Sequence, residues 1–179
     1  RCFLQGKAAL SRLRAGNVIG GGDFAAHRIL PDCIRAAVAR KPVVLRHPEG
    51  VRPYQHVLEP LYAYLMIAAM QYEESRYSGY YNVGPDDRDC VTTGELVDLF
   101  CRAWGDGQTW ENHFVGGPHE ANFLKLDCSR MKSVFGWKPA WDVRTAVEKT
   151  VEWTKEWQAG QDINTIMDRQ IQEFLADIK

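Results

Sequence analysis

The 179-residue chain has no long apolar run, no surplus of basic charge and no close pair of cysteines. No stretch approaches the roughly 18 apolar residues of a membrane-spanning helix, so we expect no membrane partner. The net charge of −1 argues against a nucleic-acid partner, because such proteins usually carry an excess of Lys and Arg. The five cysteines are widely spaced, which indicates neither a disulfide framework nor a zinc site. Together with the lack of a recognisable signal peptide, this favours a cytoplasmic setting.

Three chemical motifs are also absent. The chain has no Gly-x-Ser-x-Gly sequence, so the nucleophile elbow of many hydrolases is missing. No tyrosine is followed four residues later by a lysine, and no spacing of His, Cys, Asp or Glu is typical of a metal site. We therefore predict that this chain supplies no catalytic residue and no metal ligand.

The spacing of apolar residues and glycines predicts alternating strands and helices. Strands are expected over 8–14, 43–46, 80–83, 109–115 and 122–127. Helices are expected over 30–40, 57–72, 93–104, 129–135, 142–159 and 163–178. This alternation indicates an α/β fold. The first strand should have an unpaired edge, which is an aggregation liability.

Apolar spacing also predicts which side chains are buried. Two helical stripes are expected, the first formed by Leu58, Leu61, Leu65, Ala69 and Tyr72 and the second by Ile163, Met167, Ile171, Phe174 and Ile178. Four tryptophans are expected as core anchors, because burial of an aromatic ring contributes strongly to stability. They are Trp137, Trp141, Trp153 and Trp157.

A glycine-rich loop follows the first predicted strand. Gly20-x-Gly22-x-x-Ala25 matches the loose dinucleotide-binding fingerprint. That fingerprint requires a helix that opens at the glycines and faces the pyrophosphate. The next helix is expected only near Pro31, so we interpret the segment as a loop that leads away from a sheet.

Several polar residues are candidates for ligand binding. Asn17 follows a strand, where ligand sites of open α/β sheets lie, although it also suits a plain turn. Arg52 precedes a proline and is a candidate phosphate clamp, because its planar guanidinium pairs with two oxygens; the alternative is a solvated arginine. Arg28 and Arg46 are weaker candidates of the same kind. His119 suits a ribose or phosphate contact, or a solvated loop.

Several sequence runs, taken in order, resemble the nucleotide-sugar epimerases and dehydratases of the extended short-chain dehydrogenase family. The runs lie at 14–23, 28–32, 51–60, 81–85, 118–121 and 124–129. Three of them, Gly-Gly-Gly-Asp, Arg-Pro-Tyr-Gln-His and Pro-His-Glu-Ala, are similar to the branch that acts on CDP-glucose. The resemblance extends over about 12–157.

The resemblance implies the last part of a Rossmann-like fold with the smaller C-terminal substrate-binding domain, over 12–179, after an atypical segment 1–11. It implies an NAD-dependent lyase of deoxysugar biosynthesis that converts CDP-glucose to CDP-4-keto-6-deoxyglucose and water. The family's catalytic threonine, tyrosine and lysine, and its Asp-Glu pair, have no counterpart in this sequence. We therefore expect the chain alone to be inactive, and a homodimer only of the full-length protein.

The resemblance also implies roles for single residues. Asn17 would bind the diphosphate or the sugar, and Arg52 would clamp the diphosphate. The remaining substrate contacts are Arg28 and Ile29 at the phosphates, Val44 and Arg46 at the base or ribose, and His119 at the ribose. The backbone of Ala15, Gly16, Asn17 and Val18 would approach the nicotinamide end of NAD. At position 123 the chain has Phe where some relatives have a ligand-binding Tyr.

Other interpretations of the sequence remain open. The chain suits another nucleotide-sugar dehydratase or epimerase that takes a different base. It also suits a non-catalytic nucleotide-sugar-binding module, a fragment that does not fold alone, or a structural interaction domain. Nucleotide selectivity separates the first of these from the CDP-glucose interpretation.

Overall fold

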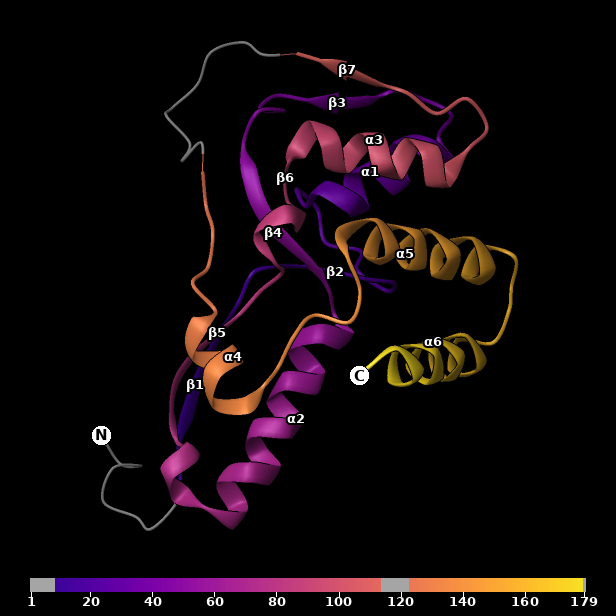
Figure 1. Cartoon of the computed structure of the whole chain (residues 1–179). Coiled ribbons are helices and arrows are strands. Elements are labelled where there is room, and N and C mark those ends of the chain that lie inside the picture. The colour runs from indigo at the N-terminus through magenta and orange to yellow at the C-terminus, as the bar shows by residue number, and fades with distance from the viewer. Residues whose placement is uncertain (1–8, 114–122, 179) are drawn as a thin grey trace.

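A computed structural model describes residues 9–113 and 123–178 (Figure 1). The strands are β1 Ser11–Ala15, β2 Asn17–Ile19, β3 Val43–Leu45, β4 Val51–His56, β5 Gly79–Val83, β6 Cys90–Thr92 and β7 Trp110–Asn112. The helices are α1 Ile29–Val38, α2 Leu58–Glu73, α3 Thr93–Trp104, α4 Ser129–Phe135, α5 Val143–Gln158 and α6 Ile163–Asp177. Two single-turn 3-10 helices, η2 Ser75–Tyr77 and η3 Asp87–Asp89, flank β5.

The strands form three small sheets, and most of their pairs are parallel. β1 pairs with β5, β2 with β4, and β3 with β7, all in parallel, whereas β4 and β6 are antiparallel. Parallel strands joined through helices confirm the predicted α/β fold. Within the described residues β1 is paired on one side only, as the sequence predicted.

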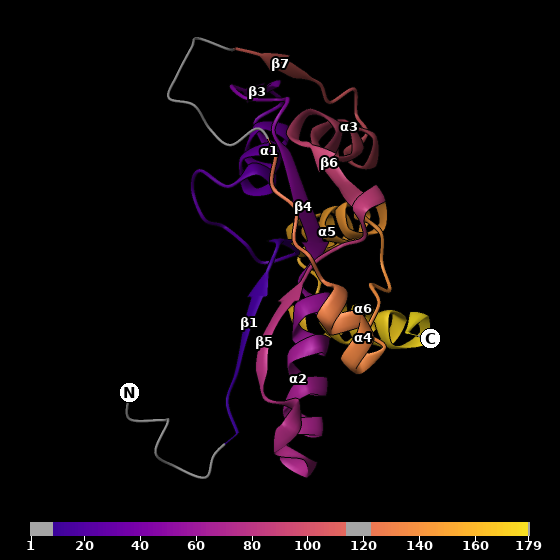
Figure 2. The same cartoon turned by 60° about the vertical axis from the view of Figure 1, so that its left-hand side comes forward.

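The described residues bury two hydrophobic cores. The helices and strands that form the larger core lie mostly above those that form the smaller core in Figures 1 and 2. The larger core lies among β2, β3, β4, α1, α3 and α5 and includes Leu30, Phe100 and Val147. The smaller core joins α2, β1, β5 and α4 through residues such as Ile67 and Val83. The short connection from β1 to β2 joins the elements of the smaller core to those of the larger one. In this connection the Gly16 amide donates a hydrogen bond of 3.1 Å to the Val83 carbonyl.

Helix boundaries agree closely with the sequence prediction because the capping signals are local. Thr92 accepts a hydrogen bond from the Glu95 amide, and the Glu95 side chain accepts one from the Thr92 amide, which forms a capping box at α3. Asp142 caps α5 by accepting from the Thr145 amide. Gly105, at φ 75°, ends α3 in a conformation that glycine adopts at low cost.

The strand predictions were less accurate. β2, β4 and β6 were not predicted, and the strand expected over 122–127 is wrong for the residues described. There Phe123 forms an isolated bridge with Val51, and the chain then runs without regular pairing to α4. The ends of two further predictions, at residue 8 and at 114–115, fall outside the described residues. Leu124 still donates a hydrogen bond of 3.1 Å to the Val51 carbonyl, so this segment lies along β4.

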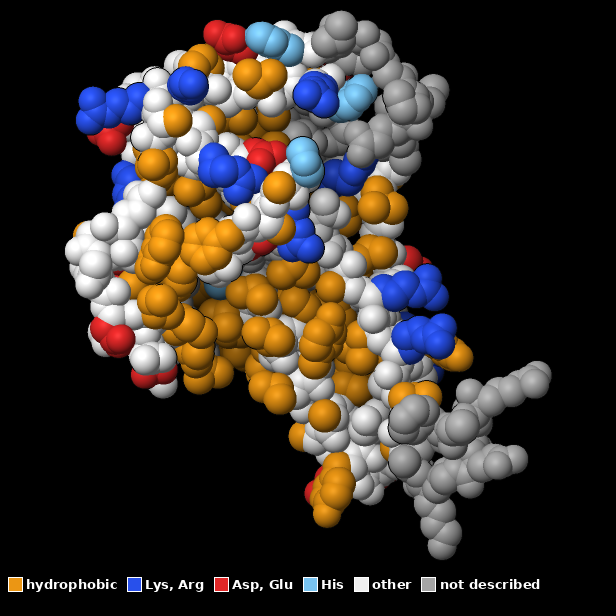
Figure 3. Space-filling model, turned by 180° about the vertical axis from the view of Figure 1, so that it is seen from behind, with side chains coloured by type: hydrophobic (Ala, Val, Ile, Leu, Met, Phe, Trp, Pro, Cys, Tyr) orange, Lys and Arg blue, Asp and Glu red, His pale blue; other side chains and the backbone are white. Residues whose placement is uncertain are grey.

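The predicted stripe on α2 faces outward, which corrects the sequence analysis. Leu65 is 72% exposed and Tyr72 is 88% exposed, whereas the helix buries Pro60, Ala63 and Ile67 instead. α2 is apolar on nearly all sides, so periodicity does not define its inner face. Figure 3 shows hydrophobic side chains gathered over much of the face opposite to that of Figure 1.

Two smaller burial predictions also need correction. On α6, Ile163 and Met167 are exposed, and the buried residues are Ile166, Gln170 and Phe174. Three of the four predicted tryptophan anchors, Trp137, Trp141 and Trp153, are buried as expected. Trp157 is 38% exposed, because it lies at the end of α5 against an exposed phenylalanine. In the part of the chain described, no helix combines the length and the hydrophobicity that crossing a bilayer requires.

Candidate functional site

A cavity of about 830 Å³ opens where β2 leads into α1, beside β3, β4 and the first turn of α3. The residues that border it are Gly16–Gly20, Asp23, His27–Asp32, Val44–His47, Arg52, Tyr54 and Thr93. Six of the predicted substrate-binding residues are among them: Asn17, Arg28, Ile29, Val44, Arg46 and Arg52. The fold thus brings together residues that are widely separated in the sequence.

Three of the four predicted cofactor-contacting residues border the same cavity. Gly16, Asn17 and Val18 border it, whereas Ala15 does not. A Cβ atom at Gly16 would lie 2.4 Å from the Pro53 carbonyl oxygen, so this close backbone crossing requires glycine. The remaining candidate, His119, lies outside the described residues.

The loop from β2 to α1 forms one wall of the cavity. Asp23 forms an ion pair of 3.1 Å with Arg28 and accepts a hydrogen bond of 3.0 Å from the Ala25 amide. α1 begins at Ile29, beyond Gly22 and Ala25. The prediction that no helix opens at the glycines is therefore confirmed, and the loop lacks the geometry of a dinucleotide fingerprint.

The cavity has a positive electrostatic character. The charged residues on its border are three arginines, Arg28, Arg46 and Arg52, and two aspartates, Asp23 and Asp32, whose formal charges sum to +1. The two acids on its border already have cationic partners within the chain, since Asp23 pairs with Arg28 and Asp32 pairs with Arg35. Among the described residues, no carboxylate lies within ion-pair distance of Arg46. A cavity with this balance suits an anionic ligand.

Arg52 is anchored by its own strand. Its Nη1 donates a hydrogen bond of 2.9 Å to the Val51 carbonyl, and a Cβ atom at Gly50 would lie only 3.3 Å from that nitrogen. The guanidinium therefore lies close over the turn that precedes β4. This anchoring limits the freedom of the side chain, which lowers the entropy cost of binding two oxygens.

Two hydroxyl groups at the cavity border were missed by the sequence analysis. The Tyr54 hydroxyl lies 3.3 Å from Thr93 Oγ1, which in turn donates a hydrogen bond of 3.2 Å to the Gly50 carbonyl. Tyr54 follows Arg52 by two residues, so alternation along a strand places both side chains on one face. That signal becomes usable only once β4 is recognised as a strand.

Two buried titratable side chains, His56 and Glu59, lie at the end of β4 and the start of α2. Burial, assisted by the charge of Lys149, lowers the pKa of His56 from 6.5 to about 4. Burial raises the pKa of Glu59 from 4.5 to about 7, against two backbone hydrogen bonds that lower it. Those bonds come from Ala140 at 2.9 Å and Trp141 at 2.8 Å. The ring of His56 also packs edge-on against Trp141, at 4.9 Å between centroids.

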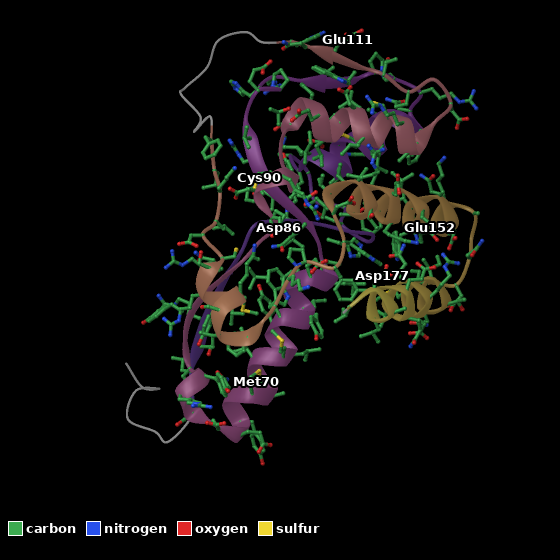
Figure 4. The ribbon with its side chains drawn as sticks, in the orientation of Figure 1. Met70, Asp86, Cys90, Glu111, Glu152 and Asp177 are labelled. Atoms are coloured by element: carbon green, nitrogen blue, oxygen red, sulfur yellow. The ribbon has the colours of Figure 1, made fainter. Side chains whose placement is uncertain are left out.

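A second cavity, of about 570 Å³, is lined by α2, η3 and the connection between α4 and α5. Its carboxylates are engaged in structural contacts: Asp142 caps α5, and Asp177 accepts a hydrogen bond of 2.8 Å from the Trp141 indole. Figure 4 labels Asp177 at the end of α6. In the residues described, no three His, Cys, Asp or Glu side chains gather as a metal site would require. The first cavity is therefore the better candidate.

Known proteins resemble this chain over most of its length. No family model matches the chain. The chain is 40% identical to CDP-glucose 4,6-dehydratase of Salmonella typhimurium (strain LT2), over 97% of this chain and 49% of that protein. The resemblance expected from the motifs is confirmed. The chain spans about half the length of the curated relative it matches.

Solved structures show the same fold. The dTDP-glucose 4,6-dehydratase of Bacillus anthracis, in complex with NAD, matches with a TM-score of 0.65 at 21% identity, over 80% of this chain and 44% of that one. The UDP-glucuronic acid 4-epimerase of Bacillus cereus, in complex with UDP-glucuronic acid and NAD, matches with a TM-score of 0.69 at 13% identity, over 83% and 46%. The chain has part of the extended short-chain dehydrogenase fold.

Proposed function

We propose that this chain is the nucleotide-sugar-binding part of an NAD-dependent CDP-glucose 4,6-dehydratase. The observation that carries the proposal is the single cavity bordered by Arg28, Arg46, Arg52 and Asn17. Its positive character suits a diphosphate, and the amide of Asn17 suits a phosphate or sugar oxygen. The 40% identity to a CDP-glucose 4,6-dehydratase supports CDP-glucose as the substrate.

Within this proposal each residue contacts a different part of the nucleotide-sugar. Arg52 clamps the diphosphate, because its guanidinium is already held over the turn before β4. Arg28 and Ile29 bind the nucleotide phosphates at the start of α1, while Val44 and Arg46 flank the base or ribose on β3 and just beyond it. His119 completes the ribose contact. Tyr54 and Thr93 add a pair of hydroxyls to the same wall.

NAD is the proposed cofactor, as in the B. anthracis and B. cereus structures, which hold NAD. The border formed by Gly16, Asn17 and Val18 fits contact with its nicotinamide end, because three consecutive residues face the cavity there. NAD, when bound, supplies the hydride acceptor for oxidation of the sugar. This chain's residues contribute orientation of the sugar nucleotide, and the catalytic residues are proposed to lie outside it. Dimerisation and a cytoplasmic role in deoxysugar synthesis are proposed for the whole protein.

Thermal melting with CDP, TDP, UDP and GDP, each alone, tests the proposal. A ligand that binds only the folded state raises the melting midpoint, so CDP alone should shift it. Arg52→Ala should abolish the shift, whereas Arg40→Ala, a matched substitution outside the cavity, should preserve it. A shift with another nucleotide would indicate a different nucleotide-sugar enzyme. A cooperative melt that no nucleotide shifts would refute nucleotide binding by this chain.

Turnover provides a second test. The purified chain, supplied with NAD and CDP-glucose, is expected to form no 4-keto product, because the family's catalytic groups have no counterpart in it. Detectable product would contradict the proposal that the chain only binds. Finding the Tyr-x-x-x-Lys pair in the coding sequence upstream would support an enzyme, and its absence there would favour a binding module.

A further inference from the structure

The Gly20–Phe24 loop, which walls the cavity, lies directly on the indole ring of Trp153. A Cβ atom at Gly21 would lie 2.1 Å from Trp153 Cγ and Cδ2, and one at Gly22 would lie 3.6 Å from Cζ2 and Cη2. Trp153 belongs to α5 and is only 6% exposed. The loop backbone is therefore in contact with a buried aromatic face, and Gly21 has no room for a side chain.

Phe24, at the end of the loop, extends this contact. Its ring lies 5.0 Å from that of Trp157 and 6.4 Å from that of Trp153, between centroids. The two tryptophans stack on each other, with centroids 6.0 Å apart and planes inclined by 19°. Phe24 is 60% exposed, yet its ring packs on this pair. The pair thus acts as a platform for the loop.

The loop is also attached to α1. Arg35 donates hydrogen bonds of 3.3 Å to the Phe24 carbonyl and 3.2 Å to the Ala25 carbonyl. Asp23, in the loop, also forms an ion pair with Arg28, just before α1. Among these residues Asp23 and Arg28 border the cavity, whereas Trp153 does not. Any influence of Trp153 on a ligand must pass through the loop.

We propose that Trp153 is a positioning residue for the nucleotide-sugar cavity. Its ring fixes the Gly20–Phe24 loop, and the loop holds the Asp23–Arg28 pair at the cavity wall. The inference depends on the proposed function only for the identity of the ligand. It assigns to α5, none of whose described residues borders the cavity, an indirect effect on affinity through the loop.

The position of the platform is in turn fixed by α6. Lys149 on α5 pairs with Glu173 at 2.6 Å, and Arg169 on α6 pairs with Glu152 at 2.9 Å. Figure 4 labels Glu152 on the α5 ribbon, above α6. Lys155 also donates a hydrogen bond of 2.6 Å to the Trp104 carbonyl at the end of α3. The C-terminal helices thereby hold the surface on which the loop lies.

Phe24→Ala provides the first test, with Tyr72→Ala as a matched removal of an exposed ring on α2. Hydrogen exchange of the amides in 20–28 is measured in the unliganded chain, and CDP affinity by calorimetry. Phe24→Ala should speed exchange of the loop roughly three- to tenfold, as loss of an aromatic contact predicts, and weaken CDP binding by up to about threefold, the effect expected for loss of Arg28 itself. The melting midpoint should stay within about 2 °C of the parent value, as for most surface substitutions. Phe24→Leu should recover part of the loss, and Tyr72→Ala should change neither readout.

Gly21→Ala provides the second test, because its methyl group has no room above Trp153. It should speed loop exchange and weaken CDP binding more than Phe24→Ala does. Adding Trp153→Leu makes space, so the double variant should bind CDP more tightly than Gly21→Ala alone, a non-additive result that a general loss of stability does not produce. If Trp153→Leu does not fold, the loop exchange and CDP affinity of Phe24→Ala and Phe24→Leu decide whether the aromatic contact positions the loop.

The readouts separate this inference from the proposed function. Unchanged loop exchange in both Phe24→Ala and Gly21→Ala would overturn the positioning role, whatever happens to CDP. Weaker CDP binding with unchanged exchange would also overturn it, since Phe24 would then be a ligand contact. Faster loop exchange in the variants of a chain that does not bind CDP would support the contact between the loop and the tryptophan pair. The same result would contradict the proposed CDP-linked ligand.

Discussion

The side-chain amide of Gln55, on β4, donates a hydrogen bond of 2.8 Å to the backbone carbonyl of Val83, at the end of β5. The same carbonyl accepts a bond of 3.1 Å from the Gly16 amide. β4 and β5 belong to different sheets, so this buried contact joins two of the sheets of the fold. The other amide atom, Oε1, is buried without a hydrogen-bond partner among the described residues.

Substitution of Gln55 should reveal how much this contact contributes. Gln55→Leu keeps the size of the side chain and should cost about 1 kcal/mol, the net value of one hydrogen bond. Gln55→Glu should cost more, about 3 kcal/mol at neutral pH, because it buries an unpaired charge that faces a carbonyl oxygen. Urea unfolding measures both values. Gln108, an exposed amide bonded to the Lys41 carbonyl at 2.9 Å, is the matched control, and Gln108→Glu should cost less than about 1 kcal/mol. Equal costs at the two positions would contradict the prediction.

The shifted pKa values of Glu59 and His56 predict opposing pH dependences of stability. The folded state keeps a proton on Glu59 between the ordinary pKa of 4.5 and about 7, so this group lowers the free energy of unfolding as pH rises through that window. His56 is neutral in the folded state down to about pH 4 but protonated below 6.5 when unfolded. It therefore lowers the free energy of unfolding as pH falls. Between pH 4.5 and 6.5 the two contributions oppose each other.

Glu59→Gln should remove the contribution of Glu59 to the pH dependence of stability and leave that of His56. The glutamine oxygen still accepts from Ala140 and Trp141, but the titration disappears. The variant's free energy of unfolding, relative to the parent, should increase by about 1.4 kcal/mol per pH unit from pH 4.5 toward pH 7. Urea unfolding at half-unit pH steps measures the difference, with Glu49→Gln, a substitution of an exposed glutamate, as the matched control. Parallel curves for Glu59→Gln and the parent would reject the assignment.

The capping box of α3 predicts a smaller, local effect. Thr92→Ala removes the acceptor of the 3.1 Å bond from the Glu95 amide and should lower the free energy of unfolding by about 1 kcal/mol. Thr92→Ser keeps the acceptor and should restore most of that loss. The urea midpoint of the three proteins provides the measurement. Equal midpoints for Thr92→Ala and Thr92→Ser would show that the cap contributes nothing.

Local signals account for what the sequence predicted correctly. Asp142 and the Thr92–Glu95 pair mark helix starts within a few residues, so α3 and α5 were predicted almost to the residue. β4 was missed because it contains Pro53 and ends in the buried polar residues Gln55 and His56, which do not suggest a strand. Its pairing with β2 and β6 depends on contacts distant in sequence, and no local pattern records them.

The same distinction applies to the candidate site. Residue chemistry alone pointed to Asn17 and Arg52, and the resemblance added Ile29 and Val44. Tyr54 and Thr93 were missed, because they meet only after β4 pairs with β6, Arg52 opposite Val91. The contact of Gly21 with Trp153 was equally hidden, since nothing in a run of three glycines identifies the helix that covers it.

Arg28 and Arg46 are not equivalent at the cavity, and this predicts an order of their effects on binding. Asp23, at 3.1 Å, already offsets the charge of Arg28, whereas Arg46 has no carboxylate at ion-pair distance among the described residues. Arg46→Gln should therefore weaken CDP binding roughly 10- to 100-fold, the range for loss of a charged hydrogen bond. Arg28→Gln should weaken it only about threefold, because a ligand must compete with Asp23 for the guanidinium.

Asp23→Asn tests the cause of that order, because it frees Arg28 and keeps an oxygen that accepts from the Ala25 amide. In the Asp23→Asn background, Arg28→Gln should cost more affinity than it does in the parent, and calorimetry of the four proteins measures the coupling. Arg40→Gln, outside the cavity, should leave the affinity unchanged in either background. If Arg28→Gln costs as much as Arg46→Gln in the parent, Asp23 does not offset the charge. In that case the ion pair would fix the conformation of the loop without lowering the contribution of Arg28 to CDP affinity.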